Sequence, residues 1–180
     1  FMRGIPVVQV PTTLLAQVVS SIGGKTAVNH KAAKNLIGTF HQPALVLSDP
    51  ELLRTLPERE YASGLYEALK YGVIRAPEIF DFFQTNAPAI QRRDPETIEK
   101  MVAACAAIKA EVVMADEKEG DLRRILNFGH TIGHGLEAAG GYRMLTHGEA
   151  VGWGMVGAIR LARRRGKLNE RLALRMEAAV

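Results

Sequence analysis

The feature that most constrains the fold is a change of pattern near residues 50–57. Before it, two short apolar segments, residues 5–10 and 43–49, have the composition and turn-forming boundaries of strands. After it, strand signals vanish and helical periodicity takes over. Three predicted helices follow, each with a proline at its start: residues 58–75, 77–87 and 95–114. The sequence therefore predicts an α/β part, residues 1–56, followed by an all-α part, residues 57–180.

Composition indicates an ordinary soluble globular protein. The 180 residues are 47% hydrophobic and 23% charged, and no apolar run reaches the ~18 residues that a membrane span needs. No signal peptide is visible, and the single cysteine, Cys105, lies in an alanine-rich helical pattern. We therefore expect no disulfide, no membrane partner and a cytoplasmic location.

The net charge is +4, and its one dense basic run covers residues 160–167. The arginines of this run lie on a helical pattern without interleaved aromatic residues. A solvated helix face explains the run better than a nucleic-acid site, so no nucleic-acid partner is expected.

Three of the five histidines fall within a short glycine-rich stretch, at His130, His134 and His147. His130 and His134 are four positions apart, so on a helix they project from the same face. Small and apolar residues surround them, and buried imidazoles need a metal or a hydrogen-bond network as partner. A lone histidine is usually a satisfied core residue, but three together favour a metal site. From spacing alone, His130 and His134 would be paired as ligands.

Two segments of the α/β part are candidate anion contacts. Thr12 and Thr13 precede an apolar periodic run, which predicts a helix N-terminus; plain capping explains these residues equally well. Residues 23–26, Gly-Gly-Lys-Thr, resemble the end of a P-loop, but no glycine stands five positions before Gly24. A Walker motif is therefore excluded, and a glycine turn that presents Lys25 remains, with Lys31, Lys34 and Asn35 in the polar segment after it.

Nine blocks stand in the order and spacing of one enzyme family: residues 3–6, 9–17, 20–26, 34–38, 56–60, 67–72, 108–113, 126–131 and 147–150. They cover nearly the whole chain and resemble 3-dehydroquinate synthases, members of the sugar phosphate cyclase superfamily. The resemblance implies the end of a Rossmann-like NAD-binding domain followed by a helical metal-binding domain. It also implies an internal fragment, without the N-terminal nucleotide-binding section and the C-terminal end.

The implied reaction converts 3-deoxy-D-arabino-heptulosonate 7-phosphate to 3-dehydroquinate and phosphate, in the second step of the shikimate pathway. In this family NAD oxidises a substrate hydroxyl, phosphate is eliminated, the hydride returns, and an aldol closure forms the ring. The transient carbonyl acidifies the neighbouring proton, so elimination becomes feasible. Zn²⁺ or Co²⁺ polarises the reacting hydroxyl as a Lewis acid.

The resemblance also assigns site residues. It implies that Glu67, His130 and His147 are the metal ligands, and that His134 is instead a proton-transfer group beside the substrate. The implied substrate contacts are Lys25, Asn35, Lys70, Lys109, Arg123 and Asn127. Arg3 would reach the substrate phosphate of a neighbouring subunit, which implies a homodimer. The implied NAD contacts are Thr12, Thr13, Leu15, Lys25, Lys34, Leu52, Arg54, Thr55 and Leu56.

One departure from the family pattern concerns Val19, where the family has an aspartate that contacts substrate hydroxyls. Losing such an acceptor usually costs a few kcal/mol, about what one buried hydrogen bond to a charged group contributes. A smaller departure covers residues 31–33, where only a loop effect is expected.

Three alternatives stay open. A valiolone or deoxy-inosose synthase would share the fold, NAD and metal; Val19 favours it, whereas Arg123, Asn127 and His134 speak against it. An alcohol dehydrogenase of the related fold is disfavoured, because its substrate would not need the lysines and the arginine among the implied substrate contacts. The chain can also be a non-catalytic remnant, folded but inactive.

Overall fold

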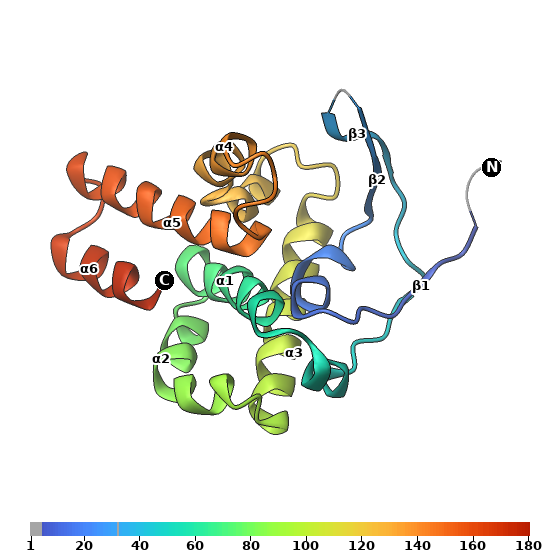
Figure 1. The fold of residues 1–180 in the computed structure, drawn as a ribbon, viewed down its shortest axis with the longest axis horizontal. Coiled ribbons are helices and arrows are strands. Elements are labelled where there is room, and N and C mark those ends of the chain that lie inside the picture. The colour runs from blue at the N-terminus through green and yellow to red at the C-terminus, as the bar shows by residue number, and fades with distance from the viewer. Residues whose placement is uncertain (1–4, 32) are drawn as a thin grey trace.

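The computed structural model describes residues 5–31 and 33–180, and Figure 1 shows helices on one side of the molecule and short strands on the other. The described chain is mostly helical, with two sheets of two strands each. The predicted order, an α/β part followed by a helical part, is confirmed. No helix among the described residues is long and apolar enough to cross a membrane.

The α/β part contains a parallel strand pair and an antiparallel hairpin. β1 (Val8–Gln9) runs parallel to β4 (Leu45–Val46), with Val8 opposite Leu45. Between them lie the π-helical turn η1 (Ala16–Ser20) and the hairpin of β2 (Lys25–His30) and β3 (Ala33–Phe40), with Lys25 opposite Phe40. The two predicted strands, residues 5–10 and 43–49, are thus shortened to their paired residues.

The β2–β3 hairpin was not predicted. Its apolar side chains do not alternate between a buried and an exposed face, because Val28, Ile37 and Phe40 are all exposed. Without that alternation the pattern gives no strand signal. The glycine turn before the hairpin was predicted correctly, since Gly23 and Gly24 have φ values of 100° and 66°, in the region that favours glycine.

Six α-helices and two short 3₁₀ segments follow β4 in the described residues. They are η2 (Pro50–Thr55), α1 (Glu58–Ile74), α2 (Pro77–Gln91), α3 (Pro95–Ala115), η3 (Leu122–Asn127), α4 (His130–Ala139), α5 (His147–Arg164) and α6 (Glu170–Ala179). The three predicted helices are confirmed. α2 continues past Pro88, because Ile90 is buried and its carbonyl accepts a 2.8 Å hydrogen bond from the Tyr61 hydroxyl.

One hydrophobic core spans both parts of the chain. Leu14 and Val18, which precede the helical part, are fully buried with Tyr71 of α1 and Cys105 of α3. The Tyr71 hydroxyl donates a 2.9 Å hydrogen bond to the carbonyl of Val18. Cys105 is free and buried. The segment around Leu14 and Val18 therefore packs against α1, the helix that carries the first predicted metal ligand.

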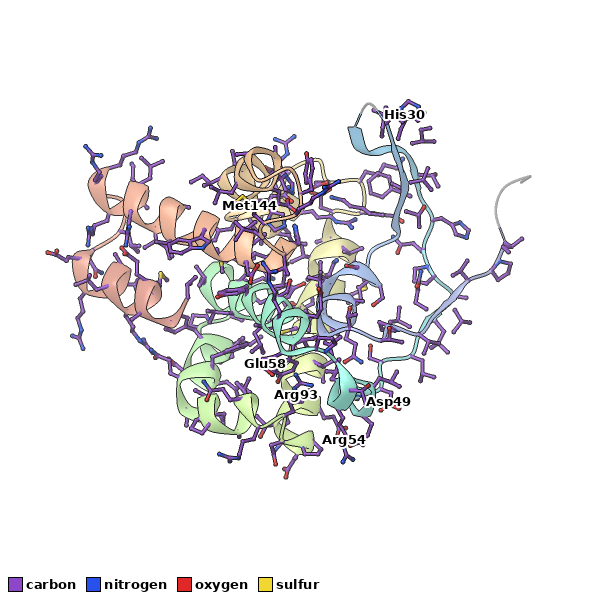
Figure 2. The ribbon with its side chains drawn as sticks, viewed as in Figure 1. His30, Asp49, Arg54, Glu58, Arg93 and Met144 are labelled. Atoms are coloured by element: carbon purple, nitrogen blue, oxygen red, sulfur yellow. The ribbon has the colours of Figure 1, made fainter. Side chains whose placement is uncertain are left out.

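Arg93 fixes the junction between η2 and α1. Its guanidinium donates to the carbonyls of Leu53 and Leu56, at 2.8 and 2.7 Å, and to the Glu58 carboxylate at 3.0 Å. The same group lies 4.5 Å from the centre of the Tyr61 ring. In Figure 2 Arg93 lies beside Glu58, where the two parts of the chain meet.

Candidate metal and anion site

Glycines allow three helices to approach closely at the histidine cluster. A Cβ on Gly148 would lie 1.9 Å from the carbonyl oxygen of Ser63, and one on Gly154 would lie 1.9 Å from that of Gly129. Gly129 has a φ of 80° and stands at the N-cap of α4. Any larger residue at these positions would push α5 away from α1 and α4, so the glycine-rich composition around the histidines serves helix packing.

The start of α5 is fixed by a capping box and an ion pair. The Thr146 hydroxyl accepts from the Glu149 amide at 3.3 Å, and the Glu149 carboxylate accepts from the Thr146 amide at 2.7 Å. Arg59 of α1 donates to both oxygens of Glu149, at 2.9 and 2.7 Å. Hydrogen bonds from Arg59 lower the pKa of Glu149 to about 2. These contacts hold His147, the first residue of α5, over α1.

Glu67, His130 and His147 form a compact cluster with the donor set of a divalent metal site. The Nε2 atoms of His130 and His147 lie 3.5 and 3.8 Å from the same oxygen, Oε1 of Glu67. Glu67 is fully buried, and this Oε1 has no hydrogen-bond partner among the described residues. One ligand atom from each residue falls within 4.8 Å of the others. A buried, unsatisfied carboxylate oxygen between two imidazole nitrogens fits a zinc-like cation.

The charges around this cluster favour its ligand forms. Burial opposes the ionisation of Glu67, but the nearby Lys70 and the histidines lower its pKa overall. Lys70 also donates a 2.6 Å hydrogen bond to Oε2 of Glu67. Burial, with the charge of Lys70, lowers the pKa of His130 to about 4. At neutral pH the cluster therefore offers a carboxylate and a neutral imidazole, as metal binding requires.

A cavity of about 280 Å³ opens beside His130 and carries four basic side chains. Its lining residues are Val19, Lys25, Lys70, Tyr71, Lys109, Glu119, Arg123, Leu126, Asn127 and His130. Glu119 is the one acid among the described residues that line it, and Glu67 behind the lining pairs with Lys70. Basic groups therefore still outnumber acids around the cavity, which suits a ligand with more than one negative charge. Val19 and Lys25 come from the α/β part and the remaining residues from the helical part. The structure thus brings together most of the predicted substrate contacts.

Two of the basic groups in the cavity are buried and held by backbone carbonyls. Lys109 donates to the carbonyl of Val19, and Arg123 donates to that of Gly23 at 2.8 Å. Burial, together with the charges of Lys70 and Arg123, lowers the pKa of Lys109 to about 7. Lys109 can therefore exchange a proton near neutral pH without leaving its place.

Two acidic residues at the site were missed from sequence. Glu119 pairs with Lys25 and accepts a 2.8 Å hydrogen bond from Asn127, so it joins two predicted substrate contacts. It lies in an acidic loop that resembles a solvated segment. Glu137 is buried beside the histidines. The sequence did contain a signal for Glu137: it follows His130 by seven positions, or two helical turns, which places both residues on one helix face.

His134 lies beside the metal cluster rather than within it. Its side chain is 63% exposed, and its ring centre is 5.4 Å from that of His130. The two rings project from the same face of α4, as their spacing predicts. His134 does not line the cationic cavity.

The predicted NAD contacts fall in two neighbouring segments. Thr13 caps the first turn, since its hydroxyl accepts a 3.2 Å hydrogen bond from the Ala16 amide. The buried Gln17 donates to the carbonyls of Pro11 and Asp49, at 3.3 and 2.8 Å, and so joins the segment of Thr12, Thr13 and Leu15 to that of Leu52, Arg54, Thr55 and Leu56. Arg3 lies outside the described residues, as do the side chains of Lys34 and Asn35.

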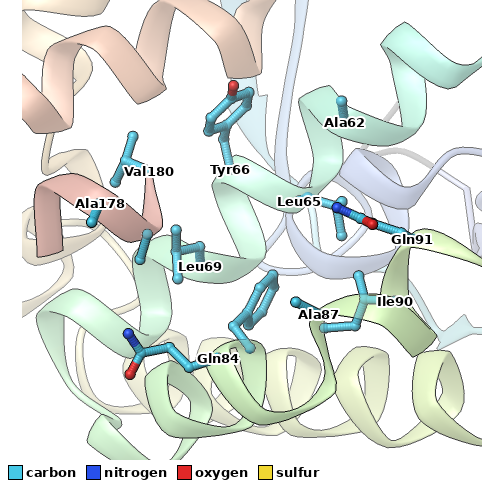
Figure 3. Close-up of a pocket in the computed structure, with 12 residues that line it drawn as sticks. Ala62, Leu65, Tyr66, Leu69, Gln84, Ala87, Ile90, Gln91, Ala178 and Val180 are labelled. Carbon is cyan, nitrogen blue, oxygen red and sulfur yellow. The ribbon is translucent and has the colours of Figure 1, made fainter. Parts of the chain in front are cut away.

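A larger cavity of about 530 Å³ lies between α1, α2 and α6 (Figure 3). On α1 it is lined by Ala62, Leu65, Tyr66 and Leu69, a different face from that of Glu67 and Lys70. No acid, histidine or basic residue is among the described residues that line it. It therefore offers no chemistry comparable to the histidine cluster.

Solved structures of sugar phosphate cyclases are similar to this chain. A 2-epi-5-epi-valiolone synthase from Streptomyces hygroscopicus subsp. jinggangensis 5008, with NAD⁺ and Zn²⁺ bound, matches with a TM-score of 0.91 and 34% identity, over 98% of this chain and 49% of that one. A 2-deoxy-scyllo-inosose synthase complexed with carbaglucose-6-phosphate, NAD⁺ and Co²⁺ matches with a TM-score of 0.90 and 32% identity, over 98% and 49%. The fold is that of the sugar phosphate cyclases.

The sequence comparison is more particular. The chain belongs to the 3-dehydroquinate synthase family: the N-terminal model of that family matches residues 1–63 and its C-terminal model matches residues 64–180. A 3-dehydroquinate synthase from Koribacter versatilis (strain Ellin345) is 60% identical over 90% of this chain and 44% of the relative. One from Solibacter usitatus (strain Ellin6076) is 57% identical over 92% and 46%. The chain thus spans less than half the length of these curated relatives.

Proposed function

We propose that this chain carries the metal and substrate site of a 3-dehydroquinate synthase, a carbon–oxygen lyase that converts 3-deoxy-D-arabino-heptulosonate 7-phosphate to 3-dehydroquinate and phosphate. The observation that carries the proposal is the buried cluster of Glu67, His130 and His147 beside a cavity with four basic side chains. The cluster suits a Lewis-acidic cation, and the cavity suits a substrate with both a carboxylate and a phosphate. The names of relatives 54–60% identical to this chain support the same reaction.

Two bound groups are part of the proposal. Glu67, His130 and His147 would hold Zn²⁺ or Co²⁺, which supplies Lewis-acid polarisation of a substrate hydroxyl. NAD supplies a hydride acceptor and later a hydride donor, and its binding residues would include the segment of Thr12, Thr13 and Leu15 with the segment of Leu52, Arg54, Thr55 and Leu56. Lys25 and Lys34 complete this proposed set.

The remaining proposed roles belong to side chains of the cavity. Lys70, Lys109 and Arg123 bind and orient the carboxylate and phosphate, because fixed cations around a multiply charged anion restrict its pose. Lys25, Asn35 and Asn127 bind substrate hydroxyls. His134 is the proposed proton-transfer group, at the exposed edge of the histidine cluster.

The proposed assembly is a cytoplasmic homodimer in which residues 1–56 and 57–180 act as two domains with the site between them. Arg3 of one subunit would contact the phosphate in the other. The buried, free Cys105 agrees with a reducing compartment.

Zinc stoichiometry on the purified chain, beside the Glu67→Ala variant, tests the metal site. We expect about one zinc per chain, lost in the variant. A folded chain that binds no zinc would contradict the proposal and favour an inactive member of the family. Phosphate release from 3-deoxy-D-arabino-heptulosonate 7-phosphate in the presence of NAD⁺ then tests the reaction.

A different sugar phosphate cyclase is the second candidate, and Val19 favours it. The valine removes the acidic acceptor expected at this position and leaves an apolar wall in the cavity. Comparing phosphate release from a sugar phosphate without a carboxylate separates the two candidates. A higher kcat/KM for the sugar phosphate without a carboxylate would contradict the proposed substrate, whereas the buried Lys109 and Arg123 predict a preference for the substrate that carries both a carboxylate and a phosphate.

A further inference from the structure

The two imidazoles of the metal cluster are held at their far nitrogens in different ways. Both point Nε2 toward Oε1 of Glu67, so their Nδ1 atoms face away from it. Nδ1 of His130 lies 3.2 Å from the carbonyl oxygen of Phe128. Nδ1 of His147 lies 3.5 Å from Oε1 of Glu137. His130 is thus held by a backbone carbonyl two residues before it, and His147 by a carboxylate from a neighbouring helix.

We propose that Glu137 is a positioning residue for His147. Its carboxylate accepts a hydrogen bond from the Nδ1–H of His147. This bond fixes the ring orientation and leaves the lone pair of Nε2 for the metal. A metal-binding imidazole commonly donates its second nitrogen to a carboxylate or carbonyl, and that partner tunes metal affinity. The inference rests on the proposed function, in which His147 is a metal ligand.

Glu137 is buried where α4 meets the start of α5. It lies on the same face of α4 as His130 and His134, and only 7% of the residue is exposed. A buried carboxylate is costly unless a donor meets it. α4 packs against α5 at Gly133, where a Cβ would lie 3.0 Å from the carbonyl oxygen of Ala150. This close packing keeps Glu137 against the first residue of α5.

Glu137 also connects the metal ligand to the proposed proton-transfer group. Its other oxygen, Oε2, lies 4.0 Å from Nε2 of His134. One face of α4 therefore supplies a ligand, an exposed imidazole and the carboxylate that orients the ligand on α5.

The same geometry suggests a competing occupant. His134, Glu137 and His147 also place ligand atoms within 4.8 Å of one another, as a second cation site would. The two arrangements exclude each other, because Nδ1 of His147 cannot both donate a proton to Glu137 and coordinate a cation. Metal stoichiometry therefore distinguishes them.

The test measures zinc affinity by competition with a chromophoric chelator in Glu137→Ala, Glu137→Gln and Glu177→Gln. Glu177 is the matched control, since its carboxylate is also mostly buried and pairs with Arg160 on α5, away from the histidines. We expect zinc affinity to fall about 10–100-fold in Glu137→Ala, to recover in part in Glu137→Gln, which keeps an acceptor oxygen, and to stay unchanged in Glu177→Gln. The visible absorption spectrum of the Co²⁺ form should change in Glu137→Ala, because the His147 ring is released.

Circular dichroism reports whether each variant folds. Should Glu137→Ala fail to fold, the isosteric Glu137→Gln decides alone, and an unchanged affinity in that variant overturns the inference. Two equivalents of tightly bound zinc, of which one is lost in Glu137→Ala, overturn it in favour of the second cation site. Glu67→Ala tests the ligand set separately from the role of Glu137. Zinc binding that survives this substitution refutes the proposed ligand set, whatever the effect of the Glu137 variants.

Discussion

The backbone of Gly148 lies directly against Ser63. The Gly148 amide donates a 2.9 Å hydrogen bond to the Ser63 hydroxyl, and a Cβ on Gly148 would lie 1.9 Å from the Ser63 carbonyl oxygen. Ser63 stands one helical turn before Glu67, and Gly148 follows His147. This contact therefore sets the distance between two proposed ligands, Glu67 and His147, which come from helices far apart in the sequence.

Gly148→Ala should separate α5 from α1. We expect a loss of about 1–3 kcal/mol in the free energy of unfolding, as in other overpacked cores, and weaker zinc binding because His147 moves away from Glu67. Urea denaturation and chelator competition measure the two effects.

The matched control for that substitution is Gly135→Ala in α4, where a Cβ would meet nothing within 4 Å. It should gain about 0.5–1 kcal/mol from reduced backbone entropy in the unfolded state and leave zinc affinity unchanged. Equal effects of the two alanines would show that the Ser63 contact does not control the site.

Alanine substitutions at the histidines should separate the proposed metal ligands from the proposed proton-transfer group. His147→Ala, like Glu67→Ala, should abolish zinc binding, because either change leaves only two of the three ligand atoms. His134→Ala should keep the metal and lower turnover, since its ring lies outside the Glu67 cluster. Equal metal loss from all three variants, measured by metal analysis after dialysis, would refute the role assigned to His134.

Within single helices the sequence predicted which side chains lie together, but it did not predict the hairpin of the α/β part. Helical periodicity placed His130 and His134 on one face, and Glu67 beside Lys70, because each pair lies within a single helix. The pairing of Glu67 with His147 depends on close packing of α1 against α5 through Gly148, and the resemblance supplied it where spacing could not. The hairpin of β2 and β3 was not predicted, because its apolar residues are exposed in the described chain and do not mark a buried face.

The two acids missed from sequence share a cause. Glu119 and Glu137 act through partners on other segments, Lys25 on β2 and His147 on α5. An isolated acid in a loop or on a helix is normally solvated, so its local pattern predicts nothing more. Only tertiary contacts distinguish such a residue from its exposed neighbours.

Lys109→Met should change how stability depends on pH. The pKa of Lys109 is about 7 in the folded chain against 10.5 for an unperturbed lysine, so between these values the unfolded state binds more protons. The free energy of unfolding therefore rises with pH in that window, by up to about 1.4 kcal/mol per pH unit. Below pH 7 the folded chain bears the full cost of burying the charged lysine. The methionine variant lacks that slope and should be more stable than the parent chain at low pH.

Urea denaturation across the window from about pH 6 to pH 10 measures the difference between the two chains. Lys100→Met, on the exposed side of α3, is the control. The pKa of Lys100 is raised by a hydrogen bond to Glu96, so its removal should not alter the slope below pH 10.5. A constant difference between Lys109→Met and the parent chain would mean that Lys109 stays charged throughout.

Val19→Asp introduces the acidic side chain that the resemblance implies at this position. Val19 lines the cavity, and its carbonyl already accepts a hydrogen bond from Lys109. A carboxylate there would stabilise the charged form of Lys109 and raise its pKa above about 7. NMR titration of methylated lysines, with the Lys109 signal assigned through Lys109→Met, measures the shift. Val28→Asp, on the exposed hairpin, should leave that signal unchanged.

Val19→Asp also tests how Val19 affects substrate specificity. An added acceptor should improve the binding of a hydroxylated acidic sugar phosphate by roughly 1 kcal/mol, or about fivefold in KM, through one new hydrogen bond. It should not help inorganic phosphate, because a second anion facing Lys109 competes with it. Improved KM for the sugar with weaker phosphate binding would identify Val19 as a specificity position, whereas no change in either would mean that the substrate hydroxyls lie elsewhere in the cavity.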